Sequence, residues 1–182
     1  EVTLHALMHD ISDRKRAEEE LRRHTEDVQA ISVAIGELAR STVATEARAA
    51  ICRAATLVSE SDFAVLFEPD PSGTGLRATG SHNFEHTGTL LPFTSRAGSI
   101  AAFTSSAMLF HADFRSSPAF ADSIFAHDPR AVSALWLPVQ RGADEAPLGV
   151  IAVAWKERIE ELSDRLERIM DVISAEAAVA IE

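Results

Sequence analysis

The sequence predicts an α+β fold, in which a central antiparallel sheet of five to six strands carries N- and C-terminal helices on one face and loops with a lid helix on the other. The first observation is in residues 131–155, where two apolar runs, VSALWLPV and LGVIAVAW, flank a polar connection at 140–147. Runs rich in β-branched and aromatic residues around such a connection are typical of a β-hairpin. The second observation is that amphipathic helical patterns lie on either side, in residues 46–59 and 157–182. At 182 residues, the chain is long enough for one domain with flanking segments.

The N-terminal segment predicts two elements that precede this domain. Residues 2–8 alternate in the manner of a strand, and the run DISDRKRAEEEL follows at 10–21. That run resembles the tail that ends many PAS sensor domains and opens a signalling helix. The resemblance implies that residues 1–12 are the end of a PAS domain and that residues 13–40 are a signalling helix. Because the chain lacks an initiating Met and stops within a helical pattern, we interpret it as a segment of a longer protein.

The predicted helix at 13–40 carries apolar residues at heptad spacing. They are Leu21, Val28, Ile31, Ile35 and Leu38. Apolar residues at alternating steps of three and four predict a coiled coil, here under three repeats long and marginal on its own. We favour a parallel dimer through this seam. An amphipathic helix on the surface of its own domain is the alternative.

Residues 41–156 hold the predicted core of the domain. The elements before the hairpin are a helix at 46–59, strands at 62–68 and 76–79, a short helix at 95–104, a strand at 107–110 and a lid helix at 119–127. Turn-forming residues separate the first two strands, as PDPSGTG at 69–75. Pro138 conflicts with a central strand because proline cannot donate to the ladder, which suggests a bulge or an unpaired position.

Residues 157–182 are predicted to form one closing helix that leads to an output domain. The stripe that extends the proposed dimer seam consists of Ile159, Leu162, Leu166, Ile169 and Ile173. A second stripe of Val172, Ala175 and Val179 points elsewhere. One face of the helix can therefore meet a partner helix while the other packs on the domain.

Several local signatures between residue 31 and residue 182 resemble the GAF domain family. SALWLPVQRGADEAPLGVIAVAW at 133–155 resembles the family's x-S-x-L-x-x-P-V…G-x-L-G-V-L hairpin, with Pro138 where that pattern has proline. SAEAAVAIE at 174–182 resembles its closing helix, and EARAAICRAATLVSESDFAVLFE at 46–68 resembles its first helix and strand. The resemblance implies a sensory core with a ligand pocket between the sheet and the loops and lid helix that cross it.

That pocket position selects the candidate ligand-binding residues. They are Phe67, His82, Phe84, His111, Asp113, Phe114, Phe120, Leu135 and Trp136. Asn83, His86, Phe125 and His127 are expected near them. An apolar pocket with a few convergent polar groups is typical of a small-molecule site. Each aromatic side chain is also expected as ordinary core, and Asp113 as part of a capped loop.

Charge and cysteine content exclude several other classes of protein. A net charge of −11 argues against a nucleic-acid groove or an anionic membrane face as partner. No apolar run reaches the ~18 residues needed to insert across a bilayer, and no signal peptide opens the chain. A single cysteine, Cys52, excludes an internal disulfide and fits a reducing compartment, so we place the protein in the cytoplasm.

Motifs for catalysis or for a known cofactor are missing from the sequence. There is no G-x-S-x-G, no H-E-x-x-H and no glycine-rich phosphate loop, so we predict no enzymatic activity. The lid cysteine that bilin-binding members of the family use is absent, as is the N-K-x-F-x-D-E pattern of cyclic-nucleotide members. His82 and His86 have no third ligand close in sequence that would favour haem or a metal ion. The cofactor, if one binds, stays unidentified.

We therefore predict a cytoplasmic GAF sensory module of a multidomain signal-transduction protein. It would bind a small molecule and relay the signal through dimeric helices to a histidine kinase, phosphatase or diguanylate cyclase. One alternative is a structural dimerisation and relay module without a ligand. Another is a small GAF-like enzyme such as a sulfoxide reductase, against which the single Cys52 argues.

Overall fold

The computed structural model describes residues 15–16, 22, 44–142 and 145–181. The predicted PAS end, the signalling helix and the five seam residues between 21 and 38 lie outside these ranges and stay predictions. The described elements are α2 (Ala44–Ser59), β1 (Phe63–Pro69), β2 (Gly75–His82), β3 (Leu90–Pro92), α3 (Gly98–Ser105), β4 (Leu109–His111), the 3₁₀ turns η1 (Phe114–Ser116), η2 (Pro118–Phe120) and η3 (Ile124–His127), β5 (Ser133–Val139), β6 (Gly149–Trp155) and α4 (Asp164–Ala180). In this part of the chain no helix is long and apolar enough to cross a membrane.

The six strands form one antiparallel sheet in the order β3-β2-β1-β6-β5-β4. The predicted hairpin is confirmed: β5 and β6 pair without interruption from Ser133↔Trp155 to Val139↔Gly149. All seven residues of each arm are buried, as expected of strands covered on both faces. The sheet and its helices confirm the α+β class and the upper end of the expected strand number. The three-residue β3 was not predicted.

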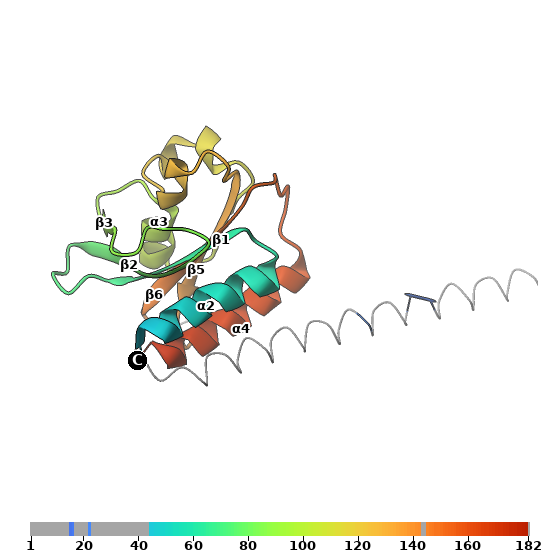
Figure 1. Cartoon of the computed structure of the whole chain (residues 1–182), viewed down its shortest axis with the longest axis horizontal. Helices are drawn as coiled ribbons and strands as arrows, with labels where there is room; N and C mark the ends of the chain where they lie inside the picture. The colour runs from blue at the N-terminus through green and yellow to red at the C-terminus, as the bar shows by residue number, and fades with distance from the viewer. Residues whose placement is uncertain (1–14, 17–21, 23–43, 143–144, 182) are drawn as a thin grey trace, which may run out of the picture.

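Helices α2 and α4 lie side by side on one face of the sheet, and α3 with the 3₁₀ turns lies on the other (Figure 1). Successive strand residues point to opposite faces, so the sheet divides the interior into two cores. The helix-side core includes Ile51, Cys52, Leu66, Leu135, Leu137, Ile151, Trp155, Met170 and Ile173. The loop-side core includes Phe63, Val65, Phe67, Leu76, Phe84, Phe114, Phe125 and Trp136.

Pro138 sits in β5 without a bulge, because no ladder donor is needed there. It pairs with Val150 of β6, while β4 on the other side pairs only with residues 134–136 of β5. The Pro138 carbonyl accepts a hydrogen bond from Ser174 Oγ of α4 at 2.7 Å, and the Gln140 N–H donates to the same hydroxyl at 3.3 Å. The hydroxyl of Ser174 thus satisfies the backbone polar groups at the end of β5. These two hydrogen bonds also fix α4 on the sheet.

The closing helix begins at Asp164, and the prediction of one helix from residue 157 is wrong. Ser163 is its N-cap, with Oγ accepting from the Leu166 N–H at 3.2 Å. Residues 156–163 form a linker, in which the Ile159 N–H donates to Ser133 Oγ at 2.8 Å. Ile159 and Leu162 therefore do not continue the helical stripe of the proposed seam. Ile169 and Ile173 are buried against the helix-side core of their own domain.

The predicted lid helix at 119–127 is replaced by the three 3₁₀ turns η1 to η3. The chain becomes extended between them, at Ser117 before Pro118 and again at Ser123, so no continuous α-helix forms. Arg115 ties this segment to the start of β5 by donating from Nε to the Ala131 carbonyl at 2.7 Å and from its terminal nitrogen to the Asp128 carbonyl. The loop-side core is covered by a strap of short turns rather than by one helix.

Candidate functional site

Four of the predicted pocket residues meet in one aromatic cluster over β5. Phe120 of η2 stacks on Trp136 with 4.8 Å between ring centroids and 24° between planes, and Phe114 of η1 meets the indole edge-on at 6.2 Å. His111 of β4 contacts Phe120 edge-on at 5.2 Å. Phe114 and Trp136 are fully buried, whereas Phe120 is only partly covered. We call these four residues the Trp136 cluster.

The indole N–H of Trp136 has no hydrogen-bond partner among the described residues, although the side chain is fully buried. Ser123 Oγ, also buried and without a partner there, follows closely, since the Ser123 N–H donates to the Phe120 carbonyl at 2.9 Å. Gly98 at the start of α3 lies so close to the indole that a Cβ there would overlap the ring. Buried polar groups are nearly always paired in native proteins, so each of these two unpaired groups marks a place for a water molecule or a ligand atom.

A second aromatic group lies at the other end of the loop side. Phe84 meets Phe63 and Phe125 edge-on at 5.7 and 5.1 Å, and His86 lies 4.6 Å from the Phe84 ring. His86 and His127 are 6.0 Å apart at the rim of an open cleft of about 730 Å³.

The rim of that cleft also carries the Asp128–Arg130 ion pair, with 2.7 Å between Oδ2 and the guanidinium. Hydrogen bonds from the Arg130 side chain and backbone, with its charge, lower the pKa of Asp128 to about 2. No group of three or more metal-ligating side chains occurs in the described part of the chain.

Asp113 and Phe67, two further predicted pocket residues, contact neighbouring protein groups. The Asp113 backbone N–H donates to His111 Nδ1 at 3.2 Å, which fixes the orientation of that ring at the edge of the Trp136 cluster. The Asp113 carboxylate lies 3.9 Å from the Arg158 guanidinium, a partly exposed pair. Phe67 is fully buried in the loop-side core. The Trp136 cluster, with His111, and the Phe84 group, with His86 and His127, are thus two separate groups on the loop side.

Leu135 and His82 do not face the loop side, contrary to the prediction. Leu135 belongs to the helix-side core, because it precedes Trp136 on one strand and adjacent strand residues point to opposite faces. His82 pairs with Ala64, a helix-side residue, because the register of β1 and β2 shifts between Leu66 and Phe67. Neither residue can line a pocket over the Trp136 cluster.

Cys52 lies in α2 with no exposed surface and belongs to the helix-side core. Burial raises the pKa of its thiol to about 12, against the smaller lowering effects of a backbone hydrogen bond from Leu66 and the charge of Arg53. The thiol is therefore protonated at neutral pH and is separated from the loop side by the sheet.

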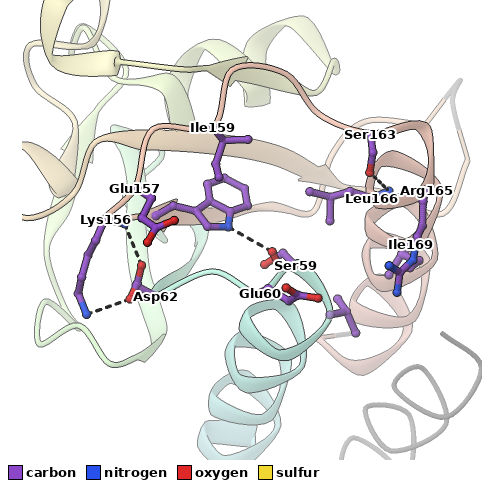
Figure 2. A pocket seen from close by; sticks show the side chains of 12 residues that line it. Ser59, Glu60, Asp62, Lys156, Glu157, Ile159, Ser163, Arg165, Leu166 and Ile169 are labelled. Atoms are coloured by element: carbon purple, nitrogen blue, oxygen red, sulfur yellow. Dashed lines mark hydrogen bonds and ion pairs between the residues drawn. The ribbon is translucent and has the colours of Figure 1, made fainter. Parts of the chain in front are cut away.

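A second cavity, of about 550 Å³, was not predicted and lies on the helix side (Figure 2). The end of α2, the end of β6, the 156–163 linker and the first turns of α4 line it. Trp155 stands in its wall, where the indole N–H donates to the Ser59 carbonyl at 3.2 Å. One sequence signal for this cavity is Ser163, a residue type favoured at helix N-caps. A helix that starts after Ser163 leaves residues 156–163 as a non-helical linker, and this linker lines the cavity.

Asp62 and Lys156 close one side of this cavity. The Asp62 carboxylate accepts from the Lys156 backbone N–H at 2.8 Å and pairs with Nζ at 2.9 Å. Partial burial alone would raise the pKa of Asp62, but the hydrogen bonds and charge of Lys156 and the charge of Arg130 outweigh it, so the pKa lies below its usual value. This pair joins the start of β1 to the end of β6.

No protein-family model matches the chain, and no curated protein sequence matches it. Solved structures do share its fold. The GAF domain from a phosphoenolpyruvate-protein phosphotransferase of Coxiella burnetii matches with a TM-score of 0.74 and 14% identity over 85% of this chain and 92% of that one. Residues 122 to 287 of a methyl-accepting chemotaxis protein match with a TM-score of 0.67 and 18% identity over 81% and 94%.

An enzyme has the same fold as well. The free methionine-R-sulfoxide reductase of Neisseria meningitidis, solved in complex with its substrate, matches with a TM-score of 0.67 and 11% identity over 85% of this chain and 87% of that one. At such identities the likeness concerns the fold alone. The structural neighbours therefore establish a GAF-type fold and leave both regulatory and enzymatic uses of it to be weighed on the residues.

Proposed function

We propose that the chain is a non-enzymatic, cytoplasmic sensory module of a signalling protein, and that it binds a small molecule at the Trp136 cluster. The observation that carries this is the buried indole N–H of Trp136, which has no partner among the described residues and lies under a strap of short turns. A ligand acceptor atom at that N–H removes the cost of an unpaired buried donor, about 1–3 kcal/mol. Structural neighbours that include a chemotaxis-protein segment and a phosphotransferase GAF domain fit this use.

The ligand chemistry follows from the cluster. Phe120 and His111 are the partly covered rings of the four, and Phe120 stacks nearly parallel on Trp136. A flat ligand that displaces Phe120 keeps the stacking on the indole, and a carbonyl or ring-nitrogen acceptor on it takes the Trp136 N–H. Ser123 Oγ, three residues after Phe120, is a second buried polar group without a partner among the described residues. The cluster therefore favours a flat, acceptor-bearing molecule.

The strap is suited to admit such a ligand. Its turns are three or four residues long, and Arg115 holds it through carbonyl groups of Asp128 and Ala131. Short 3₁₀ turns with few regular hydrogen bonds open at lower cost than a continuous helix. Displacement of Phe120 then needs movement of η2 without unfolding of the sheet.

The same strand gives a route from the ligand to α4. Trp136 lies in β5, whose first residue, Ser133, holds the linker before α4. The carbonyl of Pro138 in the same strand bonds to Ser174 within α4. A change in packing at Trp136 is thus two to three residues from both attachments of the output helix.

Partners are proposed on the same basis. Homodimerisation would use the predicted seam of residues 21–38 together with the exposed apolar side chains of α4, Val172 and Val179, which are 39% and 70% exposed. Ile169 and Ile173 contribute to the domain core instead. A PAS domain before the chain and an output domain after it remain part of the proposal, as in the sequence prediction.

A sulfoxide reductase is the competing class, because an enzyme of that kind shares the fold. Cys52 is the chain's only cysteine, and its pKa of about 12 and its helix-side position leave no thiolate at the loop side. This favours binding over catalysis. A structural module without ligand is the second candidate, favoured by the complete burial of Phe67, Phe114 and Trp136.

Native mass spectrometry and Trp136 fluorescence separate the two candidates. In a Trp155→Phe background, Trp136 is the only indole, so its emission reports the loop side alone. Retention of a small molecule by the purified chain, or a saturable change in emission with a flat probe such as hypoxanthine, is expected. The Trp155→Phe, Trp136→Phe chain is the control that should not bind. No retained molecule and no response to flat acceptor-bearing probes would favour the structural module.

A further inference from the structure

The helix-side cavity differs in place and chemistry from the loop-side cluster. Its volume of about 550 Å³ lies within the range of small-molecule sites, roughly 300–1,000 Å³. It lies where three elements converge that are far apart in sequence, the ends of α2 and β6 and the start of α4 (Figure 2). Nothing in the proposed sensing by Trp136 uses it.

The inner wall of the cavity is apolar and rigid. Trp155 is 5% exposed, and its indole N–H donates to the Ser59 carbonyl, which orients the ring. Ile159 from the linker and Leu166 from α4 lie on the same wall, both partly exposed (Figure 2). The partly exposed side chains of Ile159 and Leu166 favour an apolar body that displaces water from them, and the buried edge of the Trp155 indole forms the floor beneath.

The rim carries three carboxylates, of Glu60, Asp62 and Glu157, against the two cations of Lys156 and Arg165. Asp62 is paired with Lys156, and Arg165 has an interaction of its own. The carboxylates of Glu60 and Glu157 make no hydrogen bond or ion pair with any described residue, and both residues are exposed. Two unpaired carboxylates at the rim attract a cation and repel an anion, in a chain whose net charge is already −11.

Glu60 is also held in place by its backbone. It follows the last residue of α2 with φ of 53°, in the left-handed region, while the Ser61 N–H donates to the Thr56 carbonyl at 3.2 Å and closes the helix. Glycine is favoured at such a position and glutamate is strained there. The backbone of residue 60 is therefore held at the rim at a cost in stability.

We propose that this cavity binds a small organic cation that carries its ammonium group on an apolar body. The ammonium is held by the carboxylates of Glu60 and Glu157 at the rim, and the body covers Ile159 and Leu166. The bound molecule bridges the end of the sheet, the linker and the first turn of α4. Occupancy therefore fastens the linker to the domain.

Phenethylammonium is the probe that tests this site in the full chain. Isothermal titration calorimetry should show saturable binding, and removing both charges in Glu60→Gln, Glu157→Gln should weaken it about tenfold or more. Glu161→Gln, on the same exposed linker but outside the cavity lining, should bind as the parent chain does. Phenylacetate, with the same body and the opposite charge, should not bind.

Two further readouts keep folding and binding separate. Glu60→Gly should raise the midpoint of denaturation, because glycine relieves the left-handed strain, and should still weaken phenethylammonium binding. The probe should also slow tryptic cleavage after Lys156 and Arg158 in the linker. Absence of saturable binding, equal binding of phenylacetate, or binding that the double variant leaves unchanged would overturn the proposal. None of these results bears on the Trp136 cluster, which lies across the sheet.

Discussion

The hydroxyl of Ser133, the first residue of β5, accepts the backbone N–H of Ile159 at 2.8 Å and so attaches the sheet to the linker before α4. Its proton is shared between the carbonyls of Ala112, at 2.7 Å, and Glu157, at 3.1 Å. One fully buried side chain therefore joins the end of β4, the hairpin and the start of the output segment.

Ser133→Ala should lower the free energy of unfolding by about 1–3 kcal/mol, because buried polar groups lose their partner. Urea denaturation followed by circular dichroism measures this. Ser116→Ala is the matched control, since that exposed hydroxyl only donates to the Asp113 carbonyl, and its effect should stay within about 0.5 kcal/mol. Equal losses of stability in the two variants would contradict the claim that the hydrogen bonds of Ser133 join the sheet to the linker.

Gly98→Ala should destabilise the loop-side core by about 1–3 kcal/mol, because the added Cβ overlaps the Trp136 indole and either the ring or α3 must move. A red shift of the Trp136 emission in the Trp155→Phe background should accompany the loss. Gly142→Ala, where nothing lies within 4 Å of the added carbon, should leave stability and emission unchanged. An undisturbed Gly98→Ala chain would contradict the close packing of α3 on Trp136.

Stability should fall as the pH is lowered from about 4 to 2. The pKa of Asp128 is about 2 in the folded chain because Arg130 holds the carboxylate, whereas the unfolded chain has an ordinary aspartate. Between these values the unfolded state binds more protons, so stability rises with pH, is complete above the unfolded pKa and is lost as the pH falls through the folded one. Asp128→Asn should flatten this part of the profile. An unchanged slope in urea titrations at pH 2 to 5 would contradict the Asp128–Arg130 linkage.

Cys52 should react with a disulfide reagent such as dithionitrobenzoate only when the chain opens. Its thiol is fully buried, with a pKa raised to about 12, so at pH 8 almost no thiolate is present or accessible. Labelling should be slow in buffer and rapid in concentrated urea. Rapid stoichiometric labelling of the folded chain would reopen the sulfoxide reductase class.

Much of the sheet was predictable because its signals are long and local. Residues 131–155 have two seven-residue apolar arms joined by a short polar connection, a pattern that is typical of a hairpin and that the structure confirms. Helix α2 was confirmed for the same reason, since its small residues form one broad face. Pairing of three residues, as in β3, leaves no periodic pattern to recognise.

The errors have physical causes that differ from one another. Leu135 and Trp136 are adjacent on one strand, so the alternation of strand side chains alone separates them onto opposite faces. His82 faces the helix side because the register of β1 and β2 shifts between Leu66 and Phe67. The lid helix does not form because the backbone is extended at Ser117 and Ser123. No short sequence pattern predicts either feature. The helix-side cavity depends on three chain segments meeting, and only tertiary structure reveals that.

The most direct test of the loop-side proposal follows the two indole N–H groups by ¹⁵N–¹H correlation spectra. Trp155 N–H is already bonded to the Ser59 carbonyl, whereas Trp136 N–H has no partner among the described residues. Addition of a flat, acceptor-bearing ligand, hypoxanthine or one identified by native mass spectrometry, should move the Trp136 indole resonance downfield and slow its exchange with water, while that of Trp155 stays in place. A bound ligand that leaves the Trp136 resonance unmoved would contradict the proposed site.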